Sequence, residues 1–229
     1  MSDYKLEAAV AAMKYIKTGQ TVGVGAGSTI ANLINLIAAE PALASTLTLV
    51  SSSFTTAKLI LEKGLRLQSA NTIKELDLYF DGCDQFDEEL NALKSGGGIH
   101  TTEKILAAMA HEFILIGDAG KFSAQLDVTY PLVIEVLPNA LPFVMKHLNI
   151  NFPDASLNLR MSSQKDGALI SDHGNYLVDI HFAALLPLEE LNTKIALIPG
   201  VVAHSLFYRM AAMAIIAGQD GVKILTPQR

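Results

Sequence analysis

Apolar residues in the first 126 positions follow two patterns in turn, one typical of helices and one typical of buried strands. Apolar residues spaced three and four apart predict helices over residues 5–17, 30–39 and 53–62, and a later helix that contains Ile105, Leu106 and Met109. Short apolar runs predict strands over residues 21–24, 47–50, 78–80 and 113–116, with a further short strand at 65–67. Strands alternating with helices of about ten residues are typical of βαβ units, so we expect an α/β fold with a mostly parallel sheet.

The pattern changes after about residue 126, where prolines become frequent. Strands are predicted at residues 132–136, 157–161 and 176–180, and helices at 141–148 and 187–192. This order is typical of a small α+β domain. The chain from residue 198 to its end, with apolar segments at 213–217 and 222–225, is expected to return to the first sheet. The sequence therefore predicts one domain from residues 1–126 plus 198–229, and a smaller one from 127–197.

Composition narrows the class of protein. Half of the 229 residues are hydrophobic and 17% are charged, which is ample for a buried core. A net charge of −6, without a block of Lys and Arg, argues against a nucleic-acid surface. No apolar run reaches the roughly 18 residues of a membrane span, and charges stand where a signal peptide would be apolar. We therefore expect a cytoplasmic protein without membrane or nucleic-acid partners.

Candidate chemistry gathers in the stretch from residue 77 to 104. The predicted strand ends at Asp81 and is followed by Asp84, then by Lys94 with three glycines close behind, and then by Glu103 near a predicted helix start. Two acids, a cation, exposed amides and a third acid at the carboxyl end of a strand lie where open parallel sheets bind ligands.

Each of these features has an ordinary alternative. Asp81 and Gly82 could form a simple turn, and Glu103 could only favour the helix dipole, with Thr101 or Thr102 as the cap. The acids at residues 87–89 are expected to form a solvated helix face rather than a set of ligands. The glycines could form a flexible loop.

A second candidate site is the segment GVGAGST at residues 23–29, a glycine-rich turn between a predicted strand and helix. Backbone N–H groups at a helix N-terminus suit a phosphate. A dinucleotide fingerprint fails because Ser28 replaces its third glycine, and the P-loop pattern fails too. We therefore expect a small phosphate ester held by amides and by the Ser28 and Thr29 hydroxyls, the alternative being a packing turn. Lys121 is a further candidate for phosphate, unless it is only an exposed loop lysine.

Histidine and cysteine spacing does not indicate a metal site. No H-x-x-x-H pair or His/Cys cluster is present, and the central acids lack the spacing of a calcium loop. His100 and His204 could contact a ligand, but we expect them to be ordinary structural histidines. The single cysteine, Cys83, excludes an intrachain disulfide.

Eight segments in order resemble the ribose-5-phosphate isomerase type A family over nearly the whole chain. They are GVGAGST, SSS before a helix, DGCD, KSGGG with the following TxEK, IGDAGK, IEVLP, SDHGNYLVDI and IPGVVAHSLF. The resemblance implies a Rossmann-like domain with a mostly parallel sheet, joined to a smaller ferredoxin-like α+β domain. It implies interconversion of ribose 5-phosphate and ribulose 5-phosphate in the pentose phosphate pathway, without metal or cofactor, by a homodimer or homotetramer.

The resemblance also implies residue roles. Glu103 is the base that moves a proton between C2 and C1, and Lys94 with the loop amides faces the enediolate oxygen. Asp81 and Asp84 lie at the ring oxygen and hydroxyls, with Asp81 the preferred residue for ring opening. The remaining substrate contacts are Lys5, Ala26, Gly27, Ser28, Thr29, Gly82, Cys83, Ser95, Gly96, Gly97 and Lys121.

Some positions depart from the family pattern. Ala26 stands where threonine is common, which removes a hydroxyl contact. Cys83 replaces an alanine and, as a thiolate, would make the site sensitive to oxidants. Ser95 replaces a glycine, which matters only if that position needs a positive φ. The segments Ile99-His100 and AHSLF differ as well.

Two other classes of function stay open from the sequence. A non-catalytic sugar-phosphate sensor would use the same fold, although no added DNA-binding segment is present. An acyl-CoA transferase would use a glutamate on a similar fold, although the small-phosphate loop and the paired aspartates argue against it.

Overall fold

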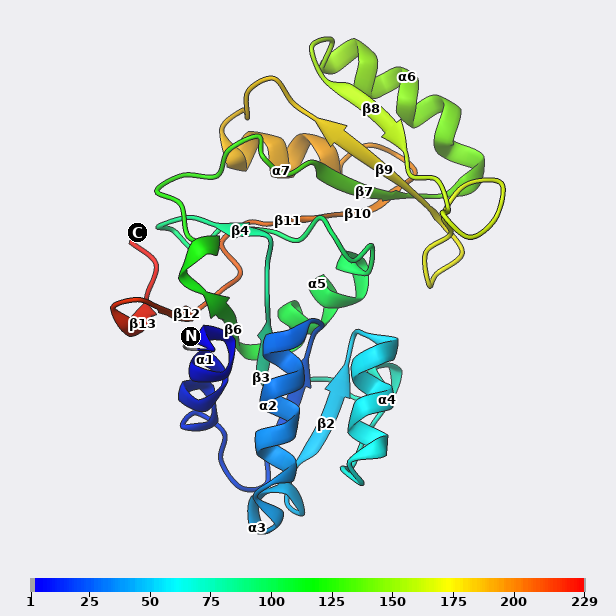
Figure 1. Cartoon of the computed structure of the whole chain (residues 1–229). Helices are drawn as coiled ribbons and strands as arrows, with labels where there is room; N and C mark the ends of the chain where they lie inside the picture. The colour runs from blue at the N-terminus through cyan, green and yellow to red at the C-terminus, as the bar shows by residue number, and fades with distance from the viewer. Residues whose placement is uncertain (1–2, 229) are drawn as a thin grey trace.

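A six-stranded sheet forms the base of the molecule in the computed structural model, which describes residues 3–228 (Figure 1). Its strands are β1 (Thr21–Val24), β2 (Thr48–Ser51), β3 (Leu76–Asp81), β6 (Ala110–Asp118), β12 (Met213–Gly218) and β13 (Gly221–Leu225). They lie in the order β13-β12-β6-β3-β1-β2, and all neighbours are parallel except the β12–β13 pair. The predicted α/β fold with a mostly parallel sheet is confirmed.

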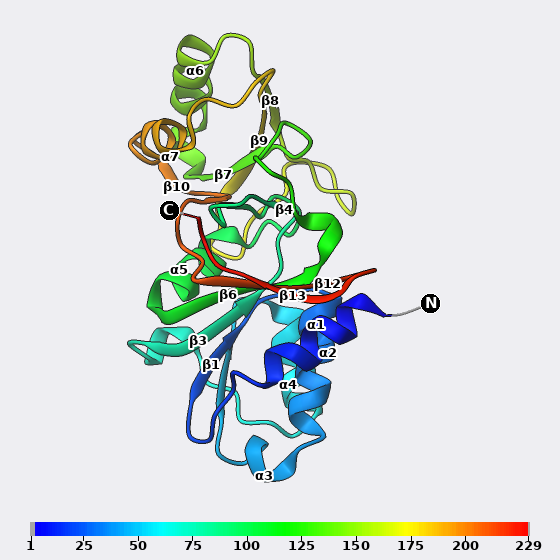
Figure 2. The same cartoon turned by 90° about the vertical axis from the view of Figure 1, so that its left-hand side faces the viewer.

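Helices cover both faces of this sheet (Figure 2). One face packs against α1 (Tyr4–Met13), α2 (Ser28–Ala38) and α4 (Phe54–Glu62), and α3 (Pro41–Ala44) is a single turn that follows α2. The other face packs against α5 (His100–Met109) and the segment that leads into β12. Because side chains alternate along a strand, Phe80 enters the first core and its neighbour Tyr79 the second.

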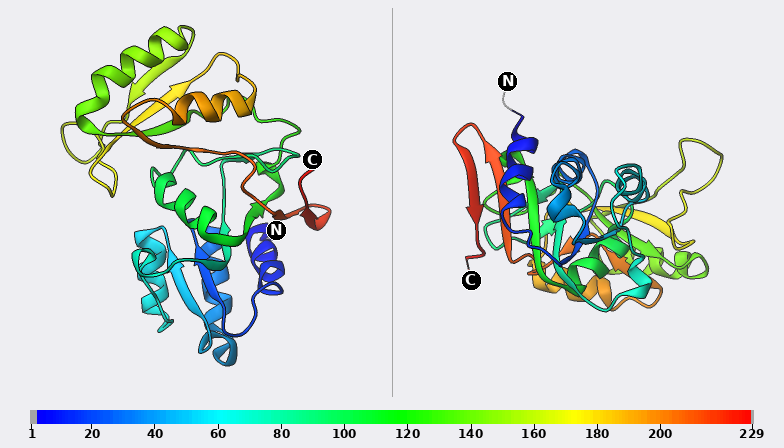
Figure 3. Two further views of the ribbon diagram at one scale, coloured as in Figure 1. Left: turned by 180° about the vertical axis from the view of Figure 1, so that it is seen from behind. Right: turned by 90° about the horizontal axis from the view of Figure 1, so that it is seen from below.

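A small domain caps the carboxyl ends of the parallel strands (Figure 3). It contains β7 (Leu132–Val136), β8 (Ser156–Leu159), β9 (Tyr176–His181) and β10 (Val201–His204) in an antiparallel sheet ordered β10-β7-β9-β8. Helices α6 (Leu141–Asn151) and α7 (Leu188–Ala196) share its apolar core. The expected α+β character of this region is present.

Strand β10 contradicts the expectation that the chain returns to the first sheet from residue 198. Its residues pair with β7 in the small sheet, so the chain does not return to the first sheet at residue 198. Apolar side chains on both sides of Pro199–Gly200, at Ile198 and Val201, pack into the core of the small domain. The domain boundaries at residues 126 and 197 remain a proposal, and we propose to move the second one past His204.

A third sheet of two-residue strands joins the two parts. It consists of β4 (Gln85–Phe86), β5 (Ala92–Leu93) and β11 (Leu206–Phe207). Residues 87–89 are therefore a hairpin turn, and the expectation of a solvated helix face was wrong. Asp87 is buried, and its carboxylate is satisfied by hydrogen bonds from the Glu89 and Asn91 backbone and from the Asn91 side chain.

Smaller differences concern element boundaries. Residues 65–67 form only a single bridge, from Leu67 to Leu49 of β2, rather than a strand. Helix α5 begins at His100 with Ile99 as its cap, so neither expected threonine caps it. The described residues also include three short 3-10 turns: Ala70–Thr72, Ala119–Lys121 and Pro138–Ala140. No helix in the described part of the chain is long and apolar enough to cross a membrane.

Candidate active site

A cleft of about 330 Å³ lies at the carboxyl ends of β1, β3 and β6. It brings together Asp81, Asp84, Lys94 and Glu103, the four residues expected to be catalytic. It also contains every expected substrate contact except Ser95, namely Lys5, Ala26, Gly27, Ser28, Thr29, Gly82, Cys83, Gly96, Gly97 and Lys121. Its volume is in the range of small-molecule pockets.

One end of the cleft is the N-terminus of α2. Gly27 precedes this helix with a φ of 101°, a conformation that favours glycine, and no side chain of the described residues caps the helix. The first N–H groups of α2 are therefore open to an anion, beside the Ser28 hydroxyl and the buried Thr29. Lys5 from α1 and Lys121 add positive charge to the lining of the cleft.

Asp81, the last residue of β3, is an anchored carboxylate. Its Oδ1 accepts hydrogen bonds from the backbone N–H groups of Ala26, at 3.2 Å, and Gly82, at 2.8 Å. Its Oδ2 accepts one from the Tyr79 hydroxyl at 2.6 Å and pairs with Lys94 Nζ at 2.8 Å. A Cβ on Gly25 would lie 1.9 Å from this carboxylate, so only glycine fits there. The backbone of Ala26 thus contributes to the site although its side chain lacks a hydroxyl.

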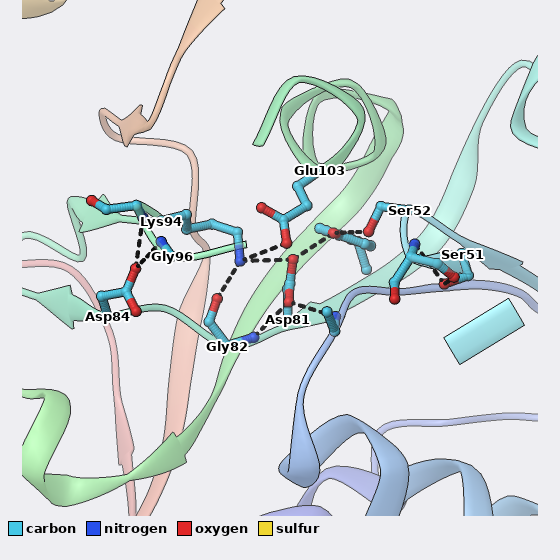
Figure 4. A network of polar contacts seen from close by, with 12 residues as sticks. Ser51, Ser52, Asp81, Gly82, Asp84, Lys94, Gly96 and Glu103 are labelled. Atoms are coloured by element: carbon cyan, nitrogen blue, oxygen red, sulfur yellow. Dashed lines mark hydrogen bonds and ion pairs between the residues drawn. The ribbon is translucent and has the colours of Figure 1, made fainter. Parts of the chain in front are cut away.

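Lys94 lies at the centre of the site (Figure 4). Its buried ammonium is 2.8 Å from Asp81 Oδ2 and 3.3 Å from Glu103 Oε1, and it donates to the Gly82 carbonyl at 2.5 Å. Burial acts to lower the pKa of Lys94, but the two carboxylates outweigh it and the pKa is raised. Lys94 is therefore a permanent cation between two acids.

Glu103 projects into the cleft from the first turn of α5, with only 5% of its surface exposed. Burial raises the pKa of its carboxyl, Lys94 lowers it and the Asp81 charge raises it again, with a resulting pKa of about 8. A carboxyl with a pKa near neutrality can both take and release a proton, as a general acid–base group must.

Asp84 is held by the glycine loop, defined here as residues 95–98. Its Oδ2 accepts hydrogen bonds from the backbone N–H groups of Ser95, at 2.6 Å, and Gly96, at 3.0 Å. Both bonds end on the same oxygen, so among the described residues Asp84 Oδ1 accepts no hydrogen bond. Ser95 does not have a positive φ, so replacing a glycine there causes no backbone strain.

Cys83 lines the cleft, but the structure argues against the sensitivity to oxidants that its sequence position suggested. Burial is the main cause that raises the pKa of its thiol, to about 12. The nearby Asp84 and Asp81 charges raise the pKa further, whereas Lys94 lowers it. The reactive thiolate is therefore scarce at neutral pH.

His100 and His204 are buried and do not line the cleft, which agrees with the structural role expected for them. Burial lowers the pKa of His100 to about 4 and that of His204 to about 3, so both are neutral at pH 7. Among the described residues, no group of three or more His, Cys, Asp or Glu side chains is placed to hold a metal ion.

Sequence analysis missed three residues that support the site. Tyr79 donates to Asp81 and lies 3.2 Å from the Ser52 hydroxyl, and both are buried. Tyr79 belongs to an apolar strand and resembles any core aromatic residue, so no local signal could reveal its role. Arg160 contacts the glycine loop from the small domain, 65 residues away from Ser95 along the chain.

The fold and the cleft define a class of protein, an α/β protein with a buried acid–base centre beside a helix N-terminus. Comparison with known proteins is more specific. The family model of ribose 5-phosphate isomerase A (phosphoriboisomerase A) matches residues 48–221. The chain belongs to this family.

Individual relatives match over nearly the full chain. Ribose-5-phosphate isomerase A of Methanosarcina acetivorans is 37% identical over 229 residues, which is 100% of this chain and 96% of the relative. Ribose-5-phosphate isomerase of Homo sapiens is 38% identical over 221 residues, which is 95% of this chain and 70% of the human protein.

Solved structures agree with this assignment. A D-ribose-5-phosphate isomerase in complex with phospho-erythronic acid has a TM-score of 0.91 and 31% identity, covering 99% of this chain and 100% of that one. Ribose 5-phosphate isomerase A of Methanocaldococcus jannaschii has a TM-score of 0.90 and 30% identity, covering 98% of both chains.

Proposed function

We propose that this chain interconverts D-ribose 5-phosphate and D-ribulose 5-phosphate through an enediolate, in the non-oxidative branch of the pentose phosphate pathway. The observation that carries the proposal is the Lys94 ammonium, which lies between the Asp81 and Glu103 carboxylates in the cleft. Aldose–ketose isomerisation requires a base that reaches two adjacent carbons and a positive group beside the oxygen that becomes negative. Family membership supports the same reaction.

Glu103 is assigned as the base. In the direction from aldose to ketose, its carboxylate takes the proton from C2 of the open-chain sugar. The electrons of that C–H bond form the C1–C2 double bond, and the carbonyl electrons move to O1 to give the enediolate. Glu103 then returns the proton to C1 while a second proton passes from O2 to O1. Its pKa of about 8 suits this exchange near neutral pH.

Lys94 and the glycine loop are assigned to the negative charge of the enediolate. The ammonium is fixed by three oxygen partners before substrate arrives, so it need not reorganise during the reaction. Gly96 and Gly97 line the cleft without side chains, which lets their backbone come close to the sugar.

Asp84 is assigned to ring opening and to the sugar hydroxyls, and Asp81 to holding Lys94. This reverses the preference that we stated from the sequence. Asp81 accepts three hydrogen bonds and makes one ion pair, so both of its carboxylate oxygens are already engaged within the protein. Asp84 keeps Oδ1 available to a sugar hydroxyl.

The phosphate is assigned to the N-terminus of α2, with Ser28, Thr29, Lys5 and Lys121 around it. The proposal also includes a cytoplasmic location, a homodimer or homotetramer, and no cofactor. These parts of the proposal rest on the family resemblance.

The test compares the purified parent with Glu103→Gln on ribose 5-phosphate, in excess EDTA, by following ribulose 5-phosphate formation. We expect conversion by the parent and a rate about 1,000-fold lower for the variant, because a positioned general base contributes roughly 100- to 10,000-fold. Glu112→Gln, at an exposed glutamate on β6, is the matched control and should retain the parent rate.

Thermal unfolding of the three proteins verifies that they are folded. A folded parent that binds ribose 5-phosphate without converting it would contradict the proposed function and favour the sensor. Full activity of Glu103→Gln would leave the reaction standing but overturn the assignment of the base.

A further inference from the structure

Arg160 connects the small domain to the back of the glycine loop. It follows β8 directly, and its own backbone is fixed by hydrogen bonds to Leu177 and Leu169. Its guanidinium is oriented by Asp179 of β9, with Nη2 2.5 Å from Oδ1 and Nε 3.3 Å from Oδ2. Such a two-point pair holds a guanidinium in one plane.

The guanidinium donates to two consecutive carbonyl groups of the loop. Nη2 lies 2.9 Å from the Ser95 carbonyl oxygen, and Nη1 lies 3.3 Å from the Gly96 carbonyl oxygen. The Ser95 hydroxyl adds a further bond to the small domain, at 2.5 Å from the Pro131 carbonyl. The outer side of the loop is therefore fastened to the small domain at three points.

Because a peptide group is planar, a contact that fixes its carbonyl also fixes the direction of its N–H group. In a trans peptide the C=O and N–H groups point in opposite directions, and none of the described peptide bonds is cis. The peptide that carries the Ser95 carbonyl also carries the Gly96 N–H, which donates to Asp84 at 3.0 Å. The next peptide carries the Gly96 carbonyl and the Gly97 N–H, and Gly97 lines the cleft. Arg160 thus holds the far ends of two amides, one of which donates to Asp84 while the other belongs to a residue that lines the cleft.

Positive charge at the carbonyl ends also strengthens these amides as donors. A hydrogen bond at one end of a peptide polarises it and strengthens the bond at the other end by roughly 10–30%. Gly98 permits the approach, because its φ of 69° is open to glycine and a Cβ there would lie 2.8 Å from the Leu177 side chain and 3.4 Å from Arg160.

We propose that Arg160 is a positioning residue of this site, which aims and polarises the Gly96 and Gly97 amides toward Asp84 and the enediolate. This inference rests on the proposed function, because it assigns the amides to the charge that isomerisation develops. Arg160 itself does not line the cleft, and it acts only through the loop.

The test uses Arg160→Met, Arg160→Lys and Asp179→Asn, with Arg66→Met as the control for loss of an exposed arginine. For Arg160→Met we expect kcat to fall about 10- to 100-fold with KM changed less than about threefold, since the effect arises as charge develops on the enediolate. Arg160→Lys should recover part of kcat, and Asp179→Asn should lose about three- to tenfold because the guanidinium is less well oriented. Arg66→Met should match the parent.

Measurements of ligand binding distinguish a positioning role of Arg160 from general damage to the fold. Phospho-erythronic acid carries a carboxylate in place of the reacting carbons and so probes the loop amides, whereas inorganic phosphate probes only the α2 end of the cleft. We expect Arg160→Met to weaken binding of phospho-erythronic acid about tenfold and to leave phosphate binding unchanged.

Equal losses for both ligands, or a kcat within twofold of the parent in a folded Arg160→Met, would overturn the inference. These outcomes differ from failure of the proposed function, in which the parent itself does not convert ribose 5-phosphate. In that case the two binding measurements still decide whether Arg160 supports the amides.

Discussion

Two buried glutamates at the first turn of α5 behave in opposite ways. Glu103 lies on the helix itself and is 5% exposed, whereas Glu135 lies on β7 of the small domain and is 1% exposed. Burial acts to raise the pKa of both carboxyls. The pKa of Glu103 rises to about 8, but that of Glu135 is lowered overall.

Hydrogen-bond donors account for the difference. Glu135 accepts from the Ser171 hydroxyl at 2.6 Å, from the Asn175 amide at 2.8 Å and from the Thr101 hydroxyl, and His173 Nδ1 lies 3.2 Å away. Glu103 has Lys94 at 3.3 Å, and it also feels the negative charge of Asp81. Donors around a carboxylate favour its charged form, whereas a neighbouring carboxylate disfavours it.

The comparison shows that burial alone does not make a carboxyl reactive. Glu135 is satisfied by its partners and joins the start of α5, through Thr101, to the loop at residues 171–175. Glu103 is paired with Lys94 but lacks the hydroxyl and amide donors that surround Glu135, and is therefore available for proton transfer. One acid stabilises the helix that carries the other.

The largest effect in this comparison is expected from Lys94→Met, which removes the ammonium that pairs with both Asp81 and Glu103. Breaking a buried ion pair leaves charge uncompensated, so the free energy of unfolding should fall by about 3 kcal/mol, and activity should fall by at least about 100-fold. Urea unfolding and the isomerase assay measure the two effects. Lys94→Met combined with Asp81→Asn, which removes the carboxylate nearest to the lost ammonium, should regain stability but not activity, and an equally unstable double variant would contradict this account.

A large pH dependence should follow from the raised pKa of Glu103. With a pKa of about 8, only about one tenth of the carboxyl is ionised at pH 7, so kcat/KM should rise several-fold between pH 7 and 9. The raised pKa also means that the protonated form stabilises the fold below pH 4.5, and that this stability is lost as pH rises through about 8. Glu103→Gln should therefore show less loss of stability than the parent between pH 6 and 9. A flat rate profile over this range would contradict the assignment.

Glu135→Gln should show the opposite sign. Because its pKa is lowered, the charged form stabilises the fold above the ordinary value of 4.5, and that stability is lost as pH falls. We expect a loss of about 2 kcal/mol at pH 7 that shrinks below pH 4.5, with kcat reduced less than roughly tenfold. Urea unfolding at pH 7 and pH 4 measures this, with Glu112→Gln as the control. If the difference in stability between the parent and Glu135→Gln grew toward low pH, hydrogen-bond donors would not be what sets the pKa of Glu135.

The smallest effect is expected at Cys83, where burial and the neighbouring carboxylates of Asp84 and Asp81 both raise the pKa of the thiol. A thiol with a pKa of about 12 is ionised to roughly one part in 30,000 at pH 7.5. Iodoacetamide at this pH should leave activity nearly unchanged, and Cys83→Ala should remain within about twofold of the parent. Rapid inactivation of the parent, with Cys83→Ala resistant, would show that the thiol is more reactive than its surroundings imply.

Much of the fold was predictable because apolar periodicity depends on local sequence. The parallel strands and their helices follow from it, and so does the position of Asp81 at the end of β3. The pairing of β10 with β7 was not predictable, because a four-residue strand with three apolar residues fits either sheet. The hairpin at Asp87 was missed for a related reason, since only the buried bonds to Asn91 distinguish a turn from a solvated helix face.

The sequence by itself determined which reactive groups this protein carries: three acids, a lysine, a glycine loop and a glycine-rich turn suited to phosphate. Their order along the chain resembles that of one family. Their number and type depend only on residue identity. The tertiary structure alone decided how these groups act, because pKa values and hydrogen bonds depend on distance and burial. Packing placed Asp81 and Lys94 beside Glu103, positioned Tyr79 behind Asp81, and brought Arg160 to the glycine loop from another domain.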